Sequence, residues 1–407
     1  MQPVKVMDNV YWVGALDHNI RDFHGYCTNS GSTYNAYLVM DEKITLIDTV
    51  KAGFVPEMMS RISKIVDPAK IDQVISNHAE MDHASGLPEA MRIIGTQKPV
   101  YATKMGEKTL KAQFHCHDLN IQIVASGDSL PMGKLSLQFL ETRMVHWPDS
   151  MFSFCPELGI LFSQDAFGMH MAGSRRFDDE VDRNVWGYEA LKYFANILTP
   201  YTGPIAKCLE GVSQSGLLAK IKMICPDHGL IWRSNLGEIV GLYSQWVQQA
   251  PARKAVVVFD SMWKSTEKMA FELADALSCH NVLVKPMNMK YNHRSDVVTE
   301  IFNAGAVLVG SPTVNNDMYP SIAEILCYMR GLKFQNKVGG AFGSYGWSGE
   351  AAKMIQASLA DMKFSLPAQE VRLQWVPTEG EMEPIRDLAK AVAEALPVEP
   401  VAPDCGL

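Results

Sequence analysis

Residues 78–83 carry the sequence HAEMDH, which places four potential metal ligands in six consecutive positions. The four are His78, Glu80, Asp82 and His83. They follow the apolar run 74–76, which is typical of a short strand, and a loop after a strand can turn several side chains toward one point. The local pattern therefore predicts a metal site, with a solvated turn as the alternative. Glu80 makes the ligand set richer in oxygen, which favours iron over zinc.

The composition indicates a globular protein with more than one domain. The chain has 407 residues, of which 47% are hydrophobic and 20% are charged. This length favours two or three domains, each of which can bury a core. The net charge of −8 argues against nucleic acid as a partner.

Cysteine spacing and the first residues bear on the cellular location. None of the eight cysteines forms a Cys-x-x-Cys pair, so the chain encodes neither a rubredoxin-type site nor an iron–sulfur site. Single scattered cysteines are typical of a reducing cytoplasm. The start, MQPVKVMD, lacks the pattern of a signal peptide, and we find no uncharged apolar run of membrane-spanning length. We therefore expect a cytoplasmic protein with no membrane association.

The first part of the chain has the pattern of a sheet-on-sheet domain. Short β-type runs dominate up to about residue 165, with helical patterns such as 54–65 and 105–113 between them. Many short strands with a few helices predict two packed sheets with helices outside, an αββα layering. Residues 180–249 are mostly helical in pattern. We expect residues 1–250 to form this domain.

The pattern changes after the short segment 250–253, a candidate linker. Five strand patterns then alternate with five helical patterns; the strands are 255–259, 281–285, 306–310, 337–342 and 371–376. This alternation predicts a doubly wound, five-stranded parallel sheet in residues 254–397. Residues 398–407 are expected to be a C-terminal tail.

Three further candidate ligands stand after predicted strands or in loops: His146, Asp165 and His228. Taken singly, each has an ordinary structural explanation, since such a histidine is often only hydrogen-bonded and such an aspartate often caps a helix. Their order along the chain, taken together with the motif at 78–83, is more informative than any of them alone. It resembles the metallo-β-lactamase fold, whose His-x-His-x-Asp-His motif is followed by a distant histidine, a bridging aspartate and a last histidine.

Glu80 in place of the second histidine, together with the sequence PDHG at 226–229, resembles the flavodiiron proteins. The resemblance implies one iron held by His78, Glu80 and His146. It implies a second iron held by Asp82, His83 and His228, with Asp165 bridging the two. Four imidazoles and three carboxylates suit an iron pair that cycles between ferrous and ferric states, although such mixed sites also bind zinc.

Other polar residues near this constellation carry weaker signals. By the same resemblance, His24 and Tyr193 would line a substrate pocket, where a proton donor is useful. The alternative is that both are hydrogen-bonded residues of a packed wall. His115 and His117 have no carboxylate close in sequence, and we interpret them as surface or structural residues.

The loop after the first strand of the second half predicts a phosphate cradle. Its residues are Ser261, Met262, Trp263, Lys264, Ser265 and Thr266. Hydroxyl groups at the start of a helix can join free backbone N–H groups and the helix dipole in binding an anion. The alternative is a simple helix cap at Ser265 or Thr266. Lys264 departs from the short-chain flavodoxin pattern, where glycine is common, but the loop resembles that of flavodiiron proteins.

Two more loops follow the third and fourth strands, where such sheets bind ligands. Their candidate cofactor-binding residues are Pro312, Thr313, Val314, Asn315 and Asn316, and then Ser344, Tyr345, Gly346 and Trp347. Pro312 and the asparagines can present polar groups to the edge of a flavin ring, and Tyr345 or Trp347 can stack on its face. One phosphate cradle without a Gly-x-Gly-x-x-Gly motif predicts FMN rather than FAD or a nicotinamide.

The resemblance to stand-alone flavodiiron proteins extends from about residue 5 to about residue 397. It implies the reduction of dioxygen to water, of nitric oxide to nitrous oxide, or of both, at two non-haem irons. Electrons would pass through FMN from a separate carrier such as a rubredoxin, in a head-to-tail homodimer or a homotetramer. The alternatives are a zinc hydrolase of the β-lactamase fold fused to a flavodoxin-like module, and an electron-transfer flavoprotein with a vestigial metal domain.

Overall fold

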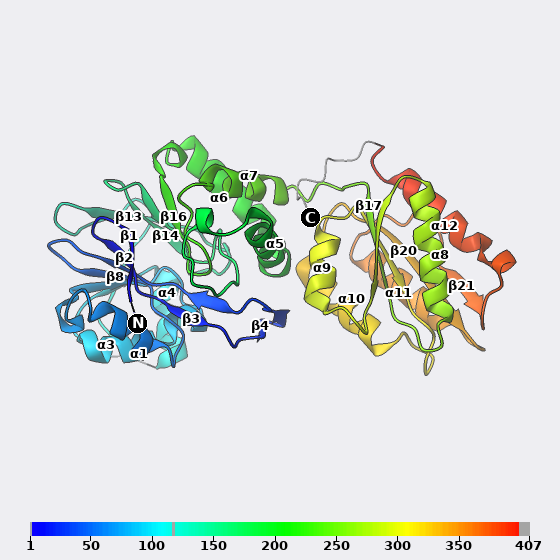
Figure 1. The fold of residues 1–407 in the computed structure, drawn as a ribbon, viewed down its shortest axis with the longest axis horizontal. Helices are drawn as coiled ribbons and strands as arrows, with labels where there is room; N and C mark the ends of the chain where they lie inside the picture. Colours follow the sequence, from blue (N-terminus) through cyan, green and yellow to red (C-terminus); the bar gives the residue numbers. More distant parts are fainter. Residues whose placement is uncertain (1, 116–118, 399–407) are drawn as a thin grey trace. The chain divides into compact units, whose positions relative to one another are not determined.

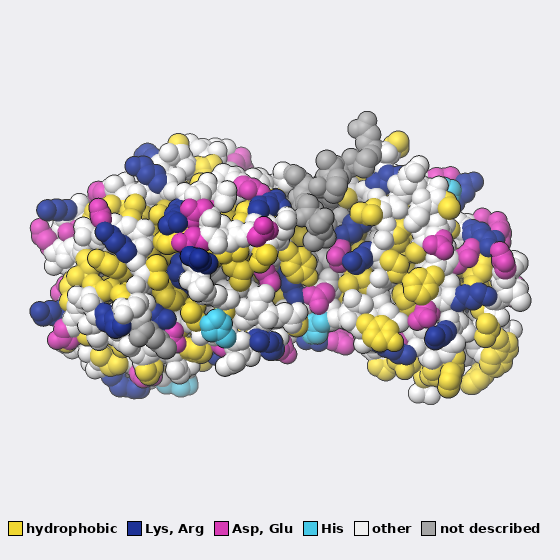
Figure 2. All heavy atoms as spheres, viewed as in Figure 1, with side chains coloured by type: hydrophobic (Ala, Val, Ile, Leu, Met, Phe, Trp, Pro, Cys, Tyr) yellow, Lys and Arg dark blue, Asp and Glu magenta, His cyan; other side chains and the backbone are white. Residues whose placement is uncertain are grey.

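The computed structural model describes residues 2–115 and 119–398, and these residues divide into two compact units. The first unit comprises the described residues of 1–23, 28–193 and 201–247. The second comprises the described residues of 24–27, 194–200 and 248–407. On the face seen in Figure 2, basic and acidic side chains are interspersed, which is typical of the surface of a globular protein.

Two sheets form the centre of the first unit. The seven-stranded sheet has the order β1 (Val4–Met7), β2 (Val10–Trp12), β7 (Tyr37–Val39), β8 (Thr45–Ile47), β9 (Gln73–Ile75), β10 (Val100–Ala102) and β11 (Ile121–Ile123). The five-stranded sheet has the order β12 (Ser129–Pro131), β13 (Ser136–Glu141), β14 (Met151–Cys155), β15 (Ile160–Phe162) and β16 (Met223–Cys225). The strands β3 (Ala15–Asp17) and β6 (Ser32–Tyr34) pair separately.

The two sheets pack face to face with helices outside. Side chains of both sheets, such as Tyr37, Ile75, Phe139 and Phe162, share one buried cluster. The other face of the seven-stranded sheet packs against α1 (Val55–Ile62), α3 (Leu87–Ile94) and α4 (Lys104–Phe114). Helices α5 (Arg183–Tyr193), α6 (Thr202–Gln214) and α7 (Leu236–Trp246) lie on the side of the five-stranded sheet (Figure 1). This confirms the predicted αββα layering.

Strand direction explains why the candidate ligands can meet. Strand β15 runs parallel to β16, and two antiparallel steps make β13 parallel to both. The carboxyl ends of these three strands therefore lie at one edge of the sheet. His146, Asp165 and His228 follow β13, β15 and β16 in the chain. The motif at 78–83 follows β9 and includes the short helix α2 (Met81–Ala84).

The second unit is a parallel sheet between helices, as predicted. Its strands have the order β18 (Leu283–Asn288), β17 (Lys254–Phe259), β19 (Ala306–Gly310), β20 (Val338–Tyr345) and β21 (Val371–Gln374). All neighbouring pairs are parallel. The connecting helices are α8 (Ser265–Cys279), α9 (Arg294–Phe302), α10 (Pro320–Leu332), α11 (Glu350–Asp361) and α12 (Glu383–Ala395). Figure 1 shows α8 and α12 on one side of this sheet and α9 and α10 on the other.

Some element bounds differ from those expected. Helix α8 begins at Ser265, so Ser265 and Thr266, predicted to lie in the loop before it, belong to its first turn. Strand β18 covers 283–288 rather than 281–285. His115 directly follows α4 as its C-cap, whereas His117 lies outside the described residues. Across residues 2–115 and 119–398, no helix has the length and apolar character that a membrane span requires.

Candidate functional site

The structure brings all seven predicted metal-ligating side chains together in the first unit. They form two groups, His78 with Glu80, His146 and Asp165, and Asp82 with His83 and His228. Within each group, one ligand atom of every residue lies within 4.8 Å of those of the others. All seven side chains are buried, the most exposed being Glu80 at 7%.

Asp165 lies between the two groups. Its Oδ2 is 2.9 Å from His146 Nε2 and 3.5 Å from His78 Nε2. Its Oδ1 is 3.0 Å from His83 Nε2 and 3.5 Å from His228 Nε2. Because each carboxylate oxygen faces one group, this residue has the geometry of a bridging ligand for two metal ions.

Several polar atoms of this cluster have no hydrogen bond of regular geometry within the described part of the chain, although some form close ion pairs, such as His83 Nε2 with Asp165 Oδ1 at 3.0 Å. They are both carboxylate oxygens of Asp82, both ring nitrogens of His83, and Asp165 Oδ1. A buried polar atom that lacks a hydrogen bond costs about 1–3 kcal/mol, so convergent orphaned atoms require an explanation. Two bound cations would explain these atoms, and their positive charge would also balance the three buried carboxylates of the cluster. The residues present therefore fit a pair of metal ions.

The buried carboxylates also act on the histidines. Burial alone would lower the pKa of His83, but the charges of Asp82 and Asp165 raise it well above its ordinary value. Burial likewise opposes protonation of His78, whereas hydrogen bonds to Asp149 and Glu80 raise its pKa well above the ordinary value. In the metal-free state these imidazoles hold protons, which metal ions must displace.

Residues outside the predicted set hold the histidine rings. Asp149 Oδ2 lies 3.1 Å from His78 Nδ1 and accepts from Ala79 N at 2.6 Å. His228 Nδ1 donates to the carbonyl of Thr33. Each contact occupies Nδ1 and leaves Nε2 facing the cluster. Thr33 is far from His228 in sequence, so no local pattern could have indicated it.

The structure places the two predicted pocket residues differently. Tyr193 is buried in the first unit, with its ring centroid 5.1 Å from that of His170 and 6.1 Å from that of His228. Burial raises the pKa of its hydroxyl well above the ordinary value, so this hydroxyl stays protonated. His24 belongs to the second unit, in the left-handed backbone region with φ of 57°. His170, which sequence reasoning missed, has Nδ1 2.8 Å from Ser32 Oγ and its ring centroid 4.6 Å from that of His228.

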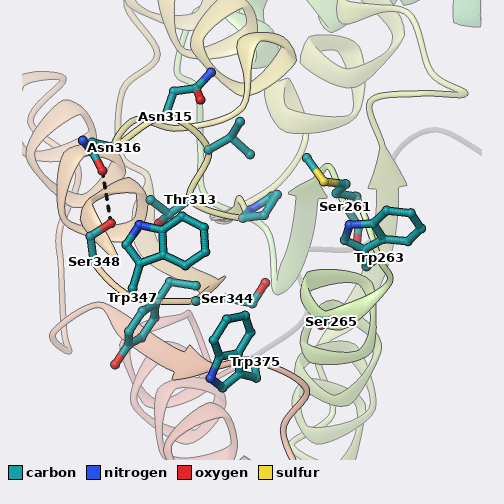
Figure 3. A pocket seen from close by; sticks show the side chains of 15 residues that line it. Ser261, Trp263, Ser265, Thr313, Asn315, Asn316, Ser344, Trp347, Ser348 and Trp375 are labelled. Carbon is teal, nitrogen blue, oxygen red and sulfur yellow. Dashed lines mark hydrogen bonds between the residues drawn. The ribbon is translucent and has the colours of Figure 1, made fainter.

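The second unit holds a cavity of about 390 Å³ at the carboxyl ends of its strands (Figure 3). Thirteen of the fifteen predicted cofactor-binding residues line it, and the two others are Lys264 and Thr266. Lys264 precedes α8 in a left-handed conformation, and Thr266 Oγ1 lies 2.8 Å from Ser344 Oγ. Ser348 and Trp375 also line the cavity. Trp375 follows β21, so the carboxyl end of the fifth strand was the signal that could have indicated it.

The cavity fits a flavin with one phosphate group. Ser261 Oγ is buried at the cavity and has no hydrogen-bond partner among the described residues. The first turn of α8 adds backbone N–H groups, which favour an anion. Figure 3 shows Trp263 and Trp347 on opposite sides of the cavity, and they are 84% and 85% exposed. Such rings can cover the faces of a planar ligand.

Comparisons with known proteins agree with both halves. Residues 33–229 match the model of the ODP family beta lactamase, and residues 257–394 match that of flavodoxin. The nitric oxide reductase of Moorella thermoacetica is 44% identical over 96% of this chain and 98% of its own length. The rubredoxin-oxygen oxidoreductase of Megalodesulfovibrio gigas is 43% identical over 97% of this chain and 98% of its own length.

Solved structures of related proteins are also similar to this chain over nearly its full length. The rubredoxin oxygen:oxidoreductase structure from Desulfovibrio gigas has a TM-score of 0.94 at 42% identity, covering 97% of this chain and 98% of that one. The flavodiiron protein from Giardia intestinalis has a TM-score of 0.93 at 36% identity, covering 97% of each chain.

The chain belongs to the flavodiiron protein family.

Membership confirms the predicted fold class, a metallo-β-lactamase-like domain followed by a flavodoxin domain. It also identifies the chain as an oxidoreductase, with FMN implied by the flavodoxin domain and a diiron site implied by its flavodiiron relatives. The alternative of a zinc hydrolase is not favoured, because the full-length relatives named above are oxidoreductases.

Proposed function

We propose that this flavodiiron protein reduces dioxygen to water, nitric oxide to nitrous oxide, or both, with electrons delivered through FMN from a separate carrier such as a rubredoxin. The observation that carries the proposal is Asp165, whose two carboxylate oxygens each face one group of ligands. The names of the relatives, a nitric oxide reductase and a rubredoxin-oxygen oxidoreductase, support both substrates.

The proposed ligation follows the two groups. His78, Glu80 and His146 would hold one iron, Asp82, His83 and His228 would hold the other, and Asp165 would bridge them. When bound, the iron pair would supply Lewis-acid and redox chemistry to the gas, and FMN would supply electrons one at a time. We place the diiron domain at residues 1–250, the FMN domain at 254–397 and a tail at 398–407.

The chain's own residues would bind and protonate the substrate. Tyr193 keeps its proton because burial raises the pKa of its hydroxyl, so it is available as a hydrogen-bond donor beside His228. We propose that His24 is also a hydrogen-bond donor to the substrate, and this proposal rests on the family resemblance alone. Burial of all seven ligands excludes bulk water from the reacting gas.

An external donor and a second subunit complete the proposal. The chain has no Cys-x-x-Cys pair of its own, which supports a separate rubredoxin-like carrier. The exposed rings of Trp263 and Trp347 at the flavin cavity are suited to an interface. On this basis and on the resemblance we propose a head-to-tail homodimer, or a homotetramer built from it. We propose a cytoplasmic location, which the scattered single cysteines support.

Rapid mixing tests the activity directly. The protein is reduced without air and mixed with dioxygen or with nitric oxide, while flavin oxidation is followed by absorbance. We expect rapid reoxidation by at least one gas, and the ratio of the two rates gives the preferred substrate. Stoichiometric zinc together with hydrolytic turnover, and no consumption of either gas, would refute the proposal.

A further inference from the structure

The loop that carries His228 makes most of its hydrogen bonds to one short segment of the first unit, residues 33–37. Thr33 O accepts the Nδ1 proton of His228, and Thr33 Oγ1 accepts from Gly229 N at 2.7 Å. The hydroxyl of Tyr37 donates to Pro226 O at 2.7 Å. Four consecutive residues, 226–229, bond to this segment, and Asp227 N also donates to Gln164 O at 2.8 Å, so the segment makes most of the contacts that hold the loop.

Asn35 makes the largest share of these contacts. Its backbone N donates to Asp227 O at 2.7 Å. Its side-chain Nδ2 donates to Pro226 O at 2.8 Å and to Gly229 O at 3.2 Å. The two side-chain bonds therefore join carbonyl groups on either side of His228. The Asn35 side chain is fully buried, so bulk water does not compete for these bonds.

Trp12 determines which way the amide of Asn35 points. Its indole Nε1 donates to Asn35 Oδ1 at 2.8 Å. Since an indole N–H can only donate, the amide oxygen must face Trp12 and the NH₂ group must face the loop. The guanidinium carbons of Arg61 and Arg176 lie 4.8 and 4.9 Å from the centroid of the Trp12 ring and stabilise it in turn.

We propose that Asn35 is a positioning residue for His228 and so determines the affinity of one of the two metal positions, the one formed by Asp82, His83 and His228. With the loop in this conformation, His228 Nε2 lies 2.9 Å from Asp82 Oδ2. The hydrogen bonds described for Asn35 go to Trp12 and the loop, and none reaches His78, Glu80 or His146. The inference rests on the proposed ligation by His228.

Anaerobic titration of the metal-free protein with ferrous iron tests the proposal. The wild type should bind two equivalents. Asn35→Ala should bind the first equivalent within about twofold of the wild-type affinity and the second about 10–100-fold more weakly, the usual cost of losing a residue that orients a ligand. Mössbauer spectra of Asn35→Ala loaded with one equivalent should show a single iron environment. It should match one of the two environments of the wild type.

One isosteric variant and its matched control keep the contacts of the loop testable if Asn35→Ala does not fold. Thr33→Val removes the acceptor for Gly229 N while keeping the carbonyl that holds His228, so it should weaken the second equivalent alone, by about 3–10-fold. Thr45→Val is the matched control. Thr45 is equally buried, and its Oγ1 accepts from Gln73 Nε2 at 2.9 Å, away from the loop. Both equivalents should bind Thr45→Val as they bind the wild type.

Different outcomes overturn different statements. Equal weakening of both equivalents in Asn35→Ala, or wild-type binding, overturns the positioning role of Asn35; if Asn35→Ala does not fold, either result in Thr33→Val overturns the proposal that this segment positions His228. Two equivalents bound with full affinity by His228→Ala would overturn the ligation itself, and with it this inference. Loss of the second equivalent in Thr45→Val would show a general effect of buried hydrogen bonds and also overturn the proposal.

Discussion

At the scale of the residue, Asp165 makes the sharpest prediction, because its two carboxylate oxygens face different ligand groups. We expect Asp165→Ala to lower gas reduction by more than about 100-fold, beyond the usual cost of a residue that only orients a ligand. FMN content should be unchanged, because the flavin cavity belongs to the second unit. Iron assay, flavin absorbance and gas consumption measure the three quantities, and retained turnover would refute the bridging role.

Asp149 is the counterpart of Asn35 for the other metal position. It accepts from Ala79 N and orients His78 through Nδ1. Asp149→Asn keeps the shape and one acceptor oxygen but removes the charge, so we expect about 10–100-fold weaker binding in the position formed by His78, Glu80 and His146. In the same iron titration, the other position should keep its affinity. A variant that lost both positions together would contradict this separation.

At the scale of the element, the start of α8 forms the proposed phosphate cradle. Ser261 Oγ lines the cavity without a hydrogen-bond partner in the described ranges, and a hydrogen bond to a charged group contributes about 1.5–3 kcal/mol. Ser261→Ala should therefore weaken FMN binding by about 10–100-fold. Riboflavin has no phosphate, so its affinity should not change. Fluorescence titration with both flavins gives the comparison, and equal loss for the two would place the phosphate elsewhere.

The elements also show what the sequence could and could not predict. The second unit was predictable because strand and helix periods alternate regularly, and its ligand loops must follow the strands. The motif at 78–83 was predictable because its ligands are local. Asp149, Asn35 and Thr33 were not, because they act on histidines 71, 193 and 195 positions away in the chain. Contacts of that range arise from the packing of the sheets and leave no periodic signal.

At the scale of the whole molecule, protons and metal ions compete for the histidine ligands of the first unit. The pKa values of His78 and His83 are raised well above the ordinary value in the metal-free geometry, so both rings bind protons that iron must displace. Lowering the pH keeps these protons in place, and we expect the apparent iron affinity to fall as the pH falls. Titrations at several pH values measure this trend, and an affinity that rose toward acid pH would contradict the assigned ligands.

Separate cores predict separate responses to the loss of metal. The buried clusters of the first unit and that of the second are made of different residues. A ligand present at 1,000 times its Kd stabilises the folded state by about 4 kcal/mol, which corresponds to a rise of about 10 °C in Tm for a domain of this size. Chelation of iron should thus lower the Tm of one calorimetric transition by about 10 °C. The transition that accompanies flavin release should stay in place, whereas removal of FMN should shift that transition and leave the iron-dependent one unchanged.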